Sequence, residues 1–64
     1  MAERVTYSVN WKDGLNLREK PNKESKVLAV LPYGEKIKVD KTANAPDGWL
    51  AVKDGGYVMS EFLK

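Results

Sequence analysis

Apolar and polar residues alternate one by one along several short stretches of this 64-residue chain. Such alternation predicts strands with one buried face, because successive side chains of a strand point to opposite sides. In the clearest case, Leu15 and Leu17 lie on one face and Asn16 lies on the other. The strand-like segments are 5–9, 15–18, 26–31, 36–40, 49–53 and 56–59. No segment has helical periodicity over a useful length, so the pattern indicates an all-β protein.

Turn signals separate these segments. The tight turns are expected at Asp13-Gly14, Pro32-Tyr33-Gly34 and Asp54-Gly55, and Gly34 is free to take a positive φ. The longest break between strands is Lys41–Gly48. After the last strand, Ser60–Leu63 is expected to form one helical turn with Ser60 as its cap.

Five or six short strands at intervals of about ten residues favour a small barrel of antiparallel strands, with one short helical turn near the C-terminus. Closure of a barrel protects strand edges that so small a sheet could not otherwise cover. The length allows one domain over residues 1–64, with its core at about 5–63. A chain of this size buries only ~60% of the surface that its unfolded form exposes, so the core has to be economical.

The residue types exclude several classes of chemistry. The chain has no cysteine and no histidine, which removes disulfides, thiolate ligands and the usual zinc ligands, and we expect no metal and no cofactor. Catalysis would need a nucleophile with its base, or paired acid and base groups in a cleft. The serines have no candidate base, and the carboxylates of interest belong to turns or to a solvated loop: Asp13, Asp47, Asp54, Glu19 and Glu24. We therefore expect no catalytic role.

Charge and hydropathy narrow the choice of partners. Eleven basic and nine acidic residues give a formal net charge of +2, with the two signs interleaved. A nucleic-acid-binding protein usually gathers its basic residues on one face, so we do not expect nucleic acid as a partner. There is no apolar run of about 18 residues, which argues against a membrane span. Residues 1–10 lack the apolar segment of a signal peptide, so export would depend on a signal in a parent chain.

An ordered set of residues over nearly the whole chain resembles the bacterial SH3-like (SH3b, SH3 type 3) domain family. The matching positions are Leu15-Asn16-Leu17-Arg18, Pro21, Ser25-Lys26-Val27-Leu28, Leu31, Gly34, Ile37, Val39, Gly48-Trp49, Val52, Gly55-Gly56-Tyr57-Val58 and Phe62-Leu63. The family pattern runs LNVR, a polar loop with proline, V..L..G..V.V, W..V, G..GWV and a terminal YL. The chain departs from it at Tyr57, where the family usually has tryptophan, in a short last hairpin, and in a longer loop with Pro46 before Trp49.

The resemblance implies an SH3-like barrel that acts as a non-catalytic binding module. Domains of this family commonly accompany cell-wall hydrolases, such as amidases or endopeptidases, and direct them to peptidoglycan. The loop 19–25 corresponds to the RT-like loop, which borders the groove where SH3-type barrels often bind ligands. The resemblance therefore implies a cell-wall or extracellular location, reached through a parent chain.

Six residues are candidates for ligand contacts in such a groove. Flat aromatic faces supply contact area at low entropic cost, and arginine can bind a carboxylate through two parallel hydrogen bonds. Peptidoglycan stem peptides carry free carboxylates, so these residue types suit them. The candidates are Trp11, Arg18, Glu19, Tyr33, Trp49 and Tyr57. A second interpretation of Arg18 stays open, in which it fastens the polar loop to the barrel together with Asn16 and Pro21.

Three hypotheses for the function remain, each for a monomer. The first is a module that binds peptidoglycan peptide and targets a cell-wall hydrolase or surface protein. The second is a protein–protein interaction module that binds a peptide or partner surface with the same groove. The third is a structural spacer without a ligand. The third is separated from the others by whether Trp11 and Trp49 are exposed together on one patch.

Overall fold

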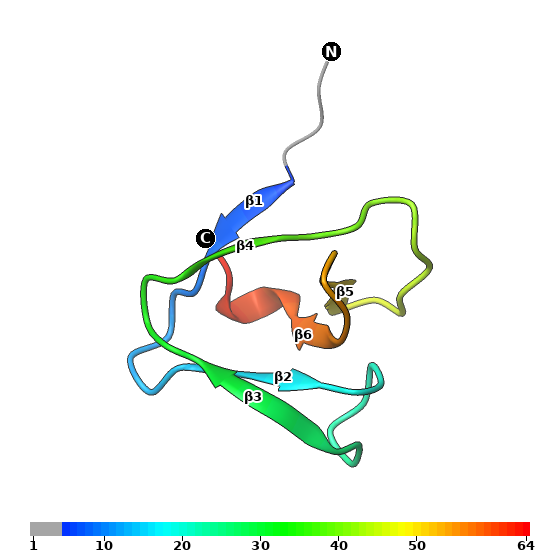
Figure 1. Ribbon diagram of the computed structural model, residues 1–64, viewed down its shortest axis with the longest axis horizontal. Helices are drawn as coiled ribbons and strands as arrows, with labels where there is room; N and C mark the ends of the chain where they lie inside the picture. Colours follow the sequence, from blue (N-terminus) through cyan, green and yellow to red (C-terminus); the bar gives the residue numbers. More distant parts are fainter. Residues whose placement is uncertain (1–4) are drawn as a thin grey trace.

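The computed structural model describes residues 5–64 and contains six short antiparallel strands and one C-terminal 3₁₀ turn (Figure 1). The elements are β1 (Thr6–Ser8), β2 (Leu15–Arg18), β3 (Val27–Leu31), β4 (Lys36–Lys38), β5 (Trp49–Ala51), β6 (Tyr57–Met59) and η1 (Ser60–Phe62). Every strand lies inside one of the segments with strand-like pattern. The all-β class, the antiparallel strands and the C-terminal turn predicted from the sequence are thus confirmed.

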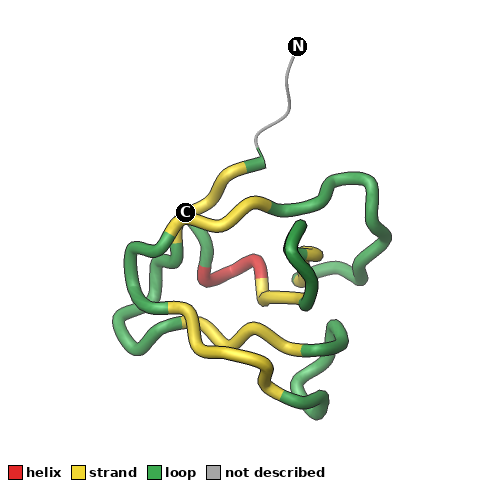
Figure 2. Tube along the Cα trace, in the orientation of Figure 1, coloured by secondary structure: helices red, strands yellow, loops and turns green. Residues whose placement is uncertain are grey.

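The strands form two sheets. β1 pairs with β4, with Tyr7 opposite Ile37. The other sheet has the order β3-β2-β6-β5, so the sequence-adjacent pairs β2–β3 and β5–β6 are joined through β2 and β6. The register shifts between Leu17 and Arg18, which pair with Ala29 and Val27, so Leu28 is an extra residue in β3 next to the polar loop. The long loop between β4 and β5 projects away from both sheets (Figure 2).

Two isolated bridges tie the sheets together. Val39, directly after β4, pairs with Val52, directly after β5. Val9, directly after β1, pairs with Leu63, which follows η1. The backbone N–H of Ser8 also donates to the carbonyl of Lys64 at 3.0 Å, and the N–H of Lys64 donates to the carbonyl of Ser8 at 2.9 Å. The C-terminus therefore lies beside the end of β1 (Figure 1).

The core is small and aliphatic. Its buried residues come from both sheets and from the two bridges: Val9, Leu15, Ile37, Val39, Ala51 and Val58. Ile37 and Val39 are buried while their neighbours Lys36 and Lys38 are exposed, as the alternation predicts. Half-buried side chains such as Tyr7, Leu17 and Phe62 pack around this centre.

Strand β3 is exposed although it is the most apolar strand of the protein. Val27, Leu28 and Val30 are 40%, 48% and 60% exposed, and only Leu31 is half-buried. β3 is an edge strand with β2 as its only neighbour in the sheet. Lys26 precedes the strand and Pro32 follows it, and both residue types discourage further pairing at an edge.

The turns follow the sequence expectations, with one correction. Gly14 and Gly34 take positive φ values of 87° and 85° in two of the predicted turns. Ser60 is wrong as a cap, because the residue before η1 is Met59 and no side chain caps the turn. Ser60 instead lies in the first position of the turn. Among residues 5–64 no helix has the length and hydropathy needed to cross a bilayer.

Candidate ligand-binding site

Strand pairing brings three of the six candidate residues to one face of the four-stranded sheet. Arg18 on β2 is directly opposite Tyr57 on β6, and paired residues lie on the same face. Met59 shares that face because it lies two residues after Tyr57, and it pairs in turn with Trp49 on β5. The face therefore carries Arg18, Tyr57 and Trp49, although these residues lie far apart in the sequence.

A hollow of about 260 Å³ lies at this face, next to the loop between β1 and β2. It is smaller than a typical cavity for a drug-sized ligand, and it fits one side chain or the end of a short peptide. Its lining residues are Trp11, Asp13, Gly14, Leu15, Asn16, Arg18, Met59 and Phe62. Trp11 and Arg18, two of the predicted contacts, thus line the same hollow.

Trp11 is held in place without being buried. Its side chain is 45% exposed, and its ring centroid lies 5.2 Å from that of Phe62 at an interplanar angle of 49°. Phe62 is half-buried and packs against the core. Aromatic pairs at this separation attract each other in tilted arrangements. Contact with Phe62 therefore orients the indole ring while one part of it stays open to solvent.

Arg18 fastens the loop between β2 and β3, which is the second of the two roles considered for it from the sequence. Its Nη1 donates to the backbone carbonyl of Ser25 at 2.9 Å. The Ser25 hydroxyl lies 2.9 Å from the carbonyl oxygen of Lys20 and 3.0 Å from that of Asn22, so Ser25 connects several parts of this loop. A guanidinium has five N–H donors, and in the described chain this is its one hydrogen bond, so donors remain for a ligand. Both interpretations of Arg18 are compatible.

Asn16 was expected to help fasten the polar loop, but its side chain lies elsewhere. Its side chain is exposed and makes no hydrogen bond within residues 5–64, so it does not fasten the polar loop. It instead lines the hollow beside Arg18, two residues away on the same strand. The amide can donate and accept, which makes Asn16 a further polar contact for a ligand.

The other candidates lie outside the hollow. Tyr33 is 63% exposed in the turn between β3 and β4, and Glu19 is exposed at the start of the loop between β2 and β3. Trp49 and Tyr57 are half-buried on the shared face, beyond the lining residues. Met59 lines the hollow but is not among the residues expected from the sequence, because its place depends on the pairing of β6 with β2 and β5.

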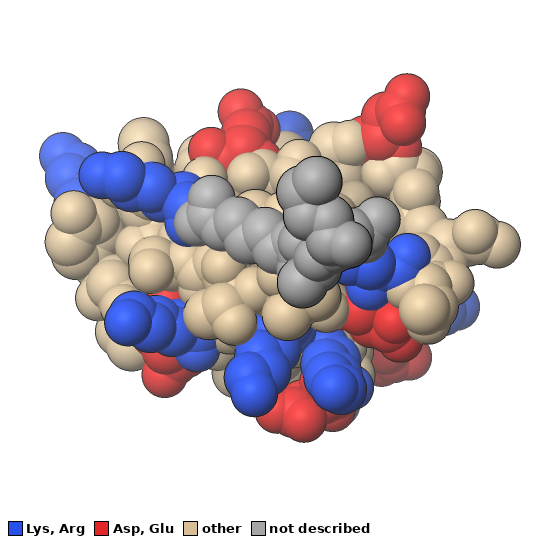
Figure 3. Space-filling model, turned by 90° about the horizontal axis from the view of Figure 1, so that it is seen from above, with Lys and Arg blue, Asp and Glu red and all other residues tan. Residues whose placement is uncertain are grey.

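The charged surface has both signs close together. In the view from above, lysine and arginine side chains lie next to aspartate and glutamate side chains over the visible face (Figure 3). Such a surface suits a solvated module rather than a phosphate backbone. No group of three or more potential metal-binding side chains occurs among residues 5–64.

The family of the chain follows from a family model described as Bacterial SH3 domain, which matches residues 13–64. The chain belongs to this family, and the resemblance seen in the sequence is confirmed. Domains of this family are typically cell-wall-binding modules without catalytic activity of their own, and they generally occur in secreted or wall-associated proteins. Neither a curated protein nor a solved structure matches the chain significantly.

Proposed function

We propose that this domain binds the peptide part of peptidoglycan and directs a cell-wall hydrolase or surface protein to the wall. The observation that carries the proposal is the hollow in which a half-exposed tryptophan, fixed by Phe62, and an arginine with spare donors line the same space. Family membership supports the class of ligand.

The chemistry of the hollow fits a short peptide with a free carboxylate. The guanidinium of Arg18 is held at one end by Ser25, so little side-chain entropy is lost when it binds a second acceptor. The indole of Trp11 offers a flat apolar surface for a small side chain. Trp49 and Tyr57 extend the same face beyond the hollow and provide contacts for the next residues of the ligand.

A protein partner that presents a C-terminal carboxylate is the second candidate, because the same groups would recognise it. A spacer role is less well supported. A spacer has no need for a half-exposed tryptophan that lines the same hollow as an arginine.

The test is an amide NMR titration of the domain with muropeptides that carry a free stem-peptide carboxylate. We expect saturable shifts at Trp11, Asn16, Arg18 and Met59. Trp11→Ala should weaken binding by ~10-fold or more, the loss typical of a central aromatic contact. Tyr33→Ala is the matched control, since it removes a more exposed turn aromatic that does not line the hollow.

Thermal unfolding of both variants shows whether any loss of affinity comes from unfolding, because Trp11 also contacts Phe62. Muropeptides in which the carboxylate is amidated should bind more weakly than the free acids. The proposal is wrong if no muropeptide causes shifts at millimolar concentration, or if Tyr33→Ala and Trp11→Ala weaken binding equally.

A further inference from the structure

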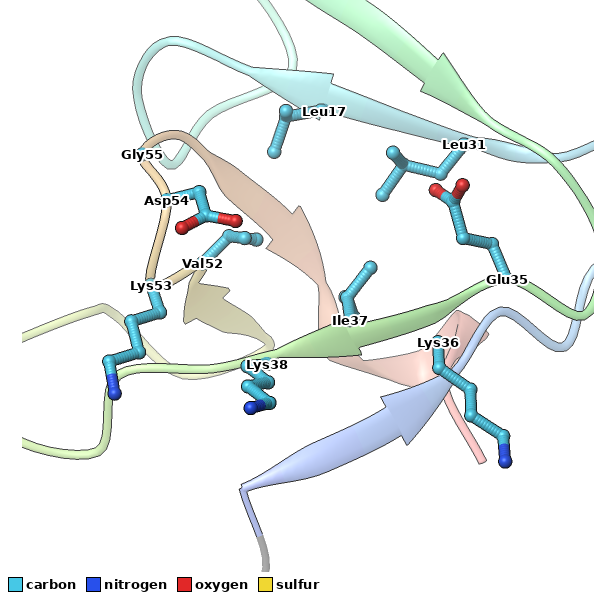
Figure 4. A pocket seen from close by; sticks show the side chains of 10 residues that line it. All are labelled: Leu17, Leu31, Glu35, Lys36, Ile37, Lys38, Val52, Lys53, Asp54 and Gly55. Carbon is cyan, nitrogen blue, oxygen red and sulfur yellow. The ribbon is translucent and has the colours of Figure 1, made fainter.

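A second and larger hollow lies between the two sheets, with a volume of about 680 Å³ (Figure 4). It is bounded by β2 and the end of β3 on one side, by β4 on the other, and by the turn between β5 and β6. This volume lies within the range of cavities that bind small ligands or a few residues of a peptide.

The floor of this hollow is the open side of the core. Four aliphatic side chains from different elements point toward one another across it: Leu17, Leu31, Ile37 and Val52 (Figure 4). Ile37 belongs to the buried cluster, whereas the other three are half-buried and pack against it. An apolar side chain from a partner would therefore extend the core of the domain, and burial of its surface would favour binding.

The charges that line the hollow are arranged by sign. The carboxylates of Glu35 and Asp54 lie at the two ends of the apolar floor, whereas the ammonium groups of Lys36, Lys38 and Lys53 point away from it (Figure 4). Within residues 5–64 neither carboxylate side chain accepts a hydrogen bond or forms an ion pair. A cationic group of a ligand at either end of the floor would meet an unpaired carboxylate at short range.

This hollow is distinct from the one that contains Trp11. Leu17 lines the larger hollow, whereas its neighbours Asn16 and Arg18 line the smaller one. The two hollows share no lining residue. The lining charges also differ. The smaller hollow has Asp13 and Arg18, whereas the larger one has the two carboxylates beside its floor and three lysines whose ammonium groups point away from it.

We propose that the larger hollow is a second binding site, which takes a peptide segment that carries an aliphatic side chain beside a cationic group. The aliphatic side chain lies on the floor formed by Leu17, Leu31, Ile37 and Val52. The cationic group binds the carboxylate of Glu35 or Asp54. The aliphatic stems of the three lysines cover the rim, and their ammonium groups remain in water.

The test uses three capped peptides with the same central leucine and with cationic, neutral or anionic flanking residues: Lys-Leu-Lys, Ser-Leu-Ser and Glu-Leu-Glu, each acetylated and amidated. Methyl NMR of the full chain reports the floor directly, without any substitution in the core. We expect Lys-Leu-Lys to shift the methyl groups of Leu17, Leu31, Ile37 and Val52 in a saturable way, with Ser-Leu-Ser weaker and Glu-Leu-Glu weakest.

Two nearly isosteric variants test the carboxylates. Each should lower the affinity for Lys-Leu-Lys by ~3–10-fold, as expected for the loss of a partly exposed charged contact. These are Glu35→Gln and Asp54→Asn. Glu24→Gln is the matched control, because Glu24 is exposed in the loop between β2 and β3 and lines neither hollow. The proposal is overturned if the floor methyl groups do not move, if Glu-Leu-Glu binds as well as Lys-Leu-Lys, or if all three variants bind equally. Because the smaller hollow is not involved, these outcomes are independent of muropeptide binding.

Discussion

Gly56 is the residue at which the turn of the β5–β6 hairpin meets β2. Its φ is +89°, and a Cβ built at this position would lie 2.7 Å from Cδ1 of Leu17 and 3.1 Å from the carbonyl oxygen of Arg18. Residues with a Cβ rarely adopt this backbone conformation, and a Cβ at this position would also collide with β2. Because Arg18 pairs with Tyr57, the next residue, this close approach positions the face that carries the candidate ligand contacts.

We predict that Gly56→Ala destabilises the domain more than Gly48→Ala. Gly48 has the same φ of +89°, but no atom lies within 4 Å of the point that a Cβ would occupy there. Gly48→Ala should therefore cost about 1–2 kcal/mol from the left-handed conformation alone. Gly56→Ala should cost at least about 1 kcal/mol more, because β2 has to move. Urea denaturation measures both free energies of unfolding, and equal losses would contradict the role of close packing.

At the scale of elements, the long loop between β4 and β5 is organised at its start by Asp40. The hydroxyl of Thr42 donates to Oδ1 of Asp40 at 2.6 Å, and the N–H of Thr42 donates to the same oxygen at 2.9 Å. These two hydrogen bonds, the hydroxyl one first, lower the pKa of Asp40 below its ordinary value of 3.8, and the charge of Lys53 adds a smaller effect. The carboxylate form of Asp40 is thus the form that orders this part of the loop.

The sign of the pH dependence follows from this lowered pKa. The folded protein binds the proton of Asp40 less readily than the unfolded chain, so the contribution to stability is present above pH 3.8 and is lost as the pH falls through the lower pKa of the folded state. We predict that Thr42→Val raises the pKa of Asp40 toward 3.8, because it removes the hydroxyl donor and keeps the shape. Carboxyl ¹³C NMR of Asp40 measures this, and an unchanged pKa would show that the hydroxyl does not hold the carboxylate.

The strands could be predicted from the sequence because each depends on local alternation and on a nearby turn. Lys36 to Val39 is an example, since the two exposed lysines and the buried Ile37 and Val39 follow from period two alone. The exposure of β3 could not be predicted in this way. An apolar run such as 27–31 predicts a strand, but whether another strand covers it depends on the order of the sheet, which is a long-range property.

The residue types of the candidate site could be predicted from the sequence, but the way in which the residues come together could not. Trp11 and Arg18 were identified as groove residues, and they line the same hollow. The partner that orients Trp11 is Phe62, at the other end of the chain, and no local pattern connects the two. Likewise, Met59 reaches the hollow only because β6 pairs between β2 and β5, which neither alternation nor turn chemistry specifies.

At the scale of the whole molecule, the edge strand β3 is an apolar surface that the sheets leave uncovered. Val27, Leu28 and Val30 are all exposed on this strand. An apolar edge strand with unpaired backbone groups is a site for association with other chains. The flanking Lys26 and Pro32 limit this association only at the two ends of the strand.

We predict that Val30→Lys raises the concentration at which the domain starts to aggregate and changes the free energy of unfolding by less than about 0.5 kcal/mol, as is usual for exposed positions. A charge on the edge opposes strand addition. Ala43→Lys adds the same charge at an exposed position of the long loop and is the matched control. Light scattering during concentration compares the variants. Equal improvement in both would assign the effect to net charge instead of to the edge.

The pairing of the two chain ends also determines how the domain responds to a pulling force. Segment 62–64 runs antiparallel to segment 8–10, through hydrogen bonds that join Ser8 to Lys64 and Asn10 to Phe62. The chain therefore enters and leaves at the same end of this short ladder. A load applied at the two ends would open its bonds one after another, as in a zipper, instead of shearing them all at once.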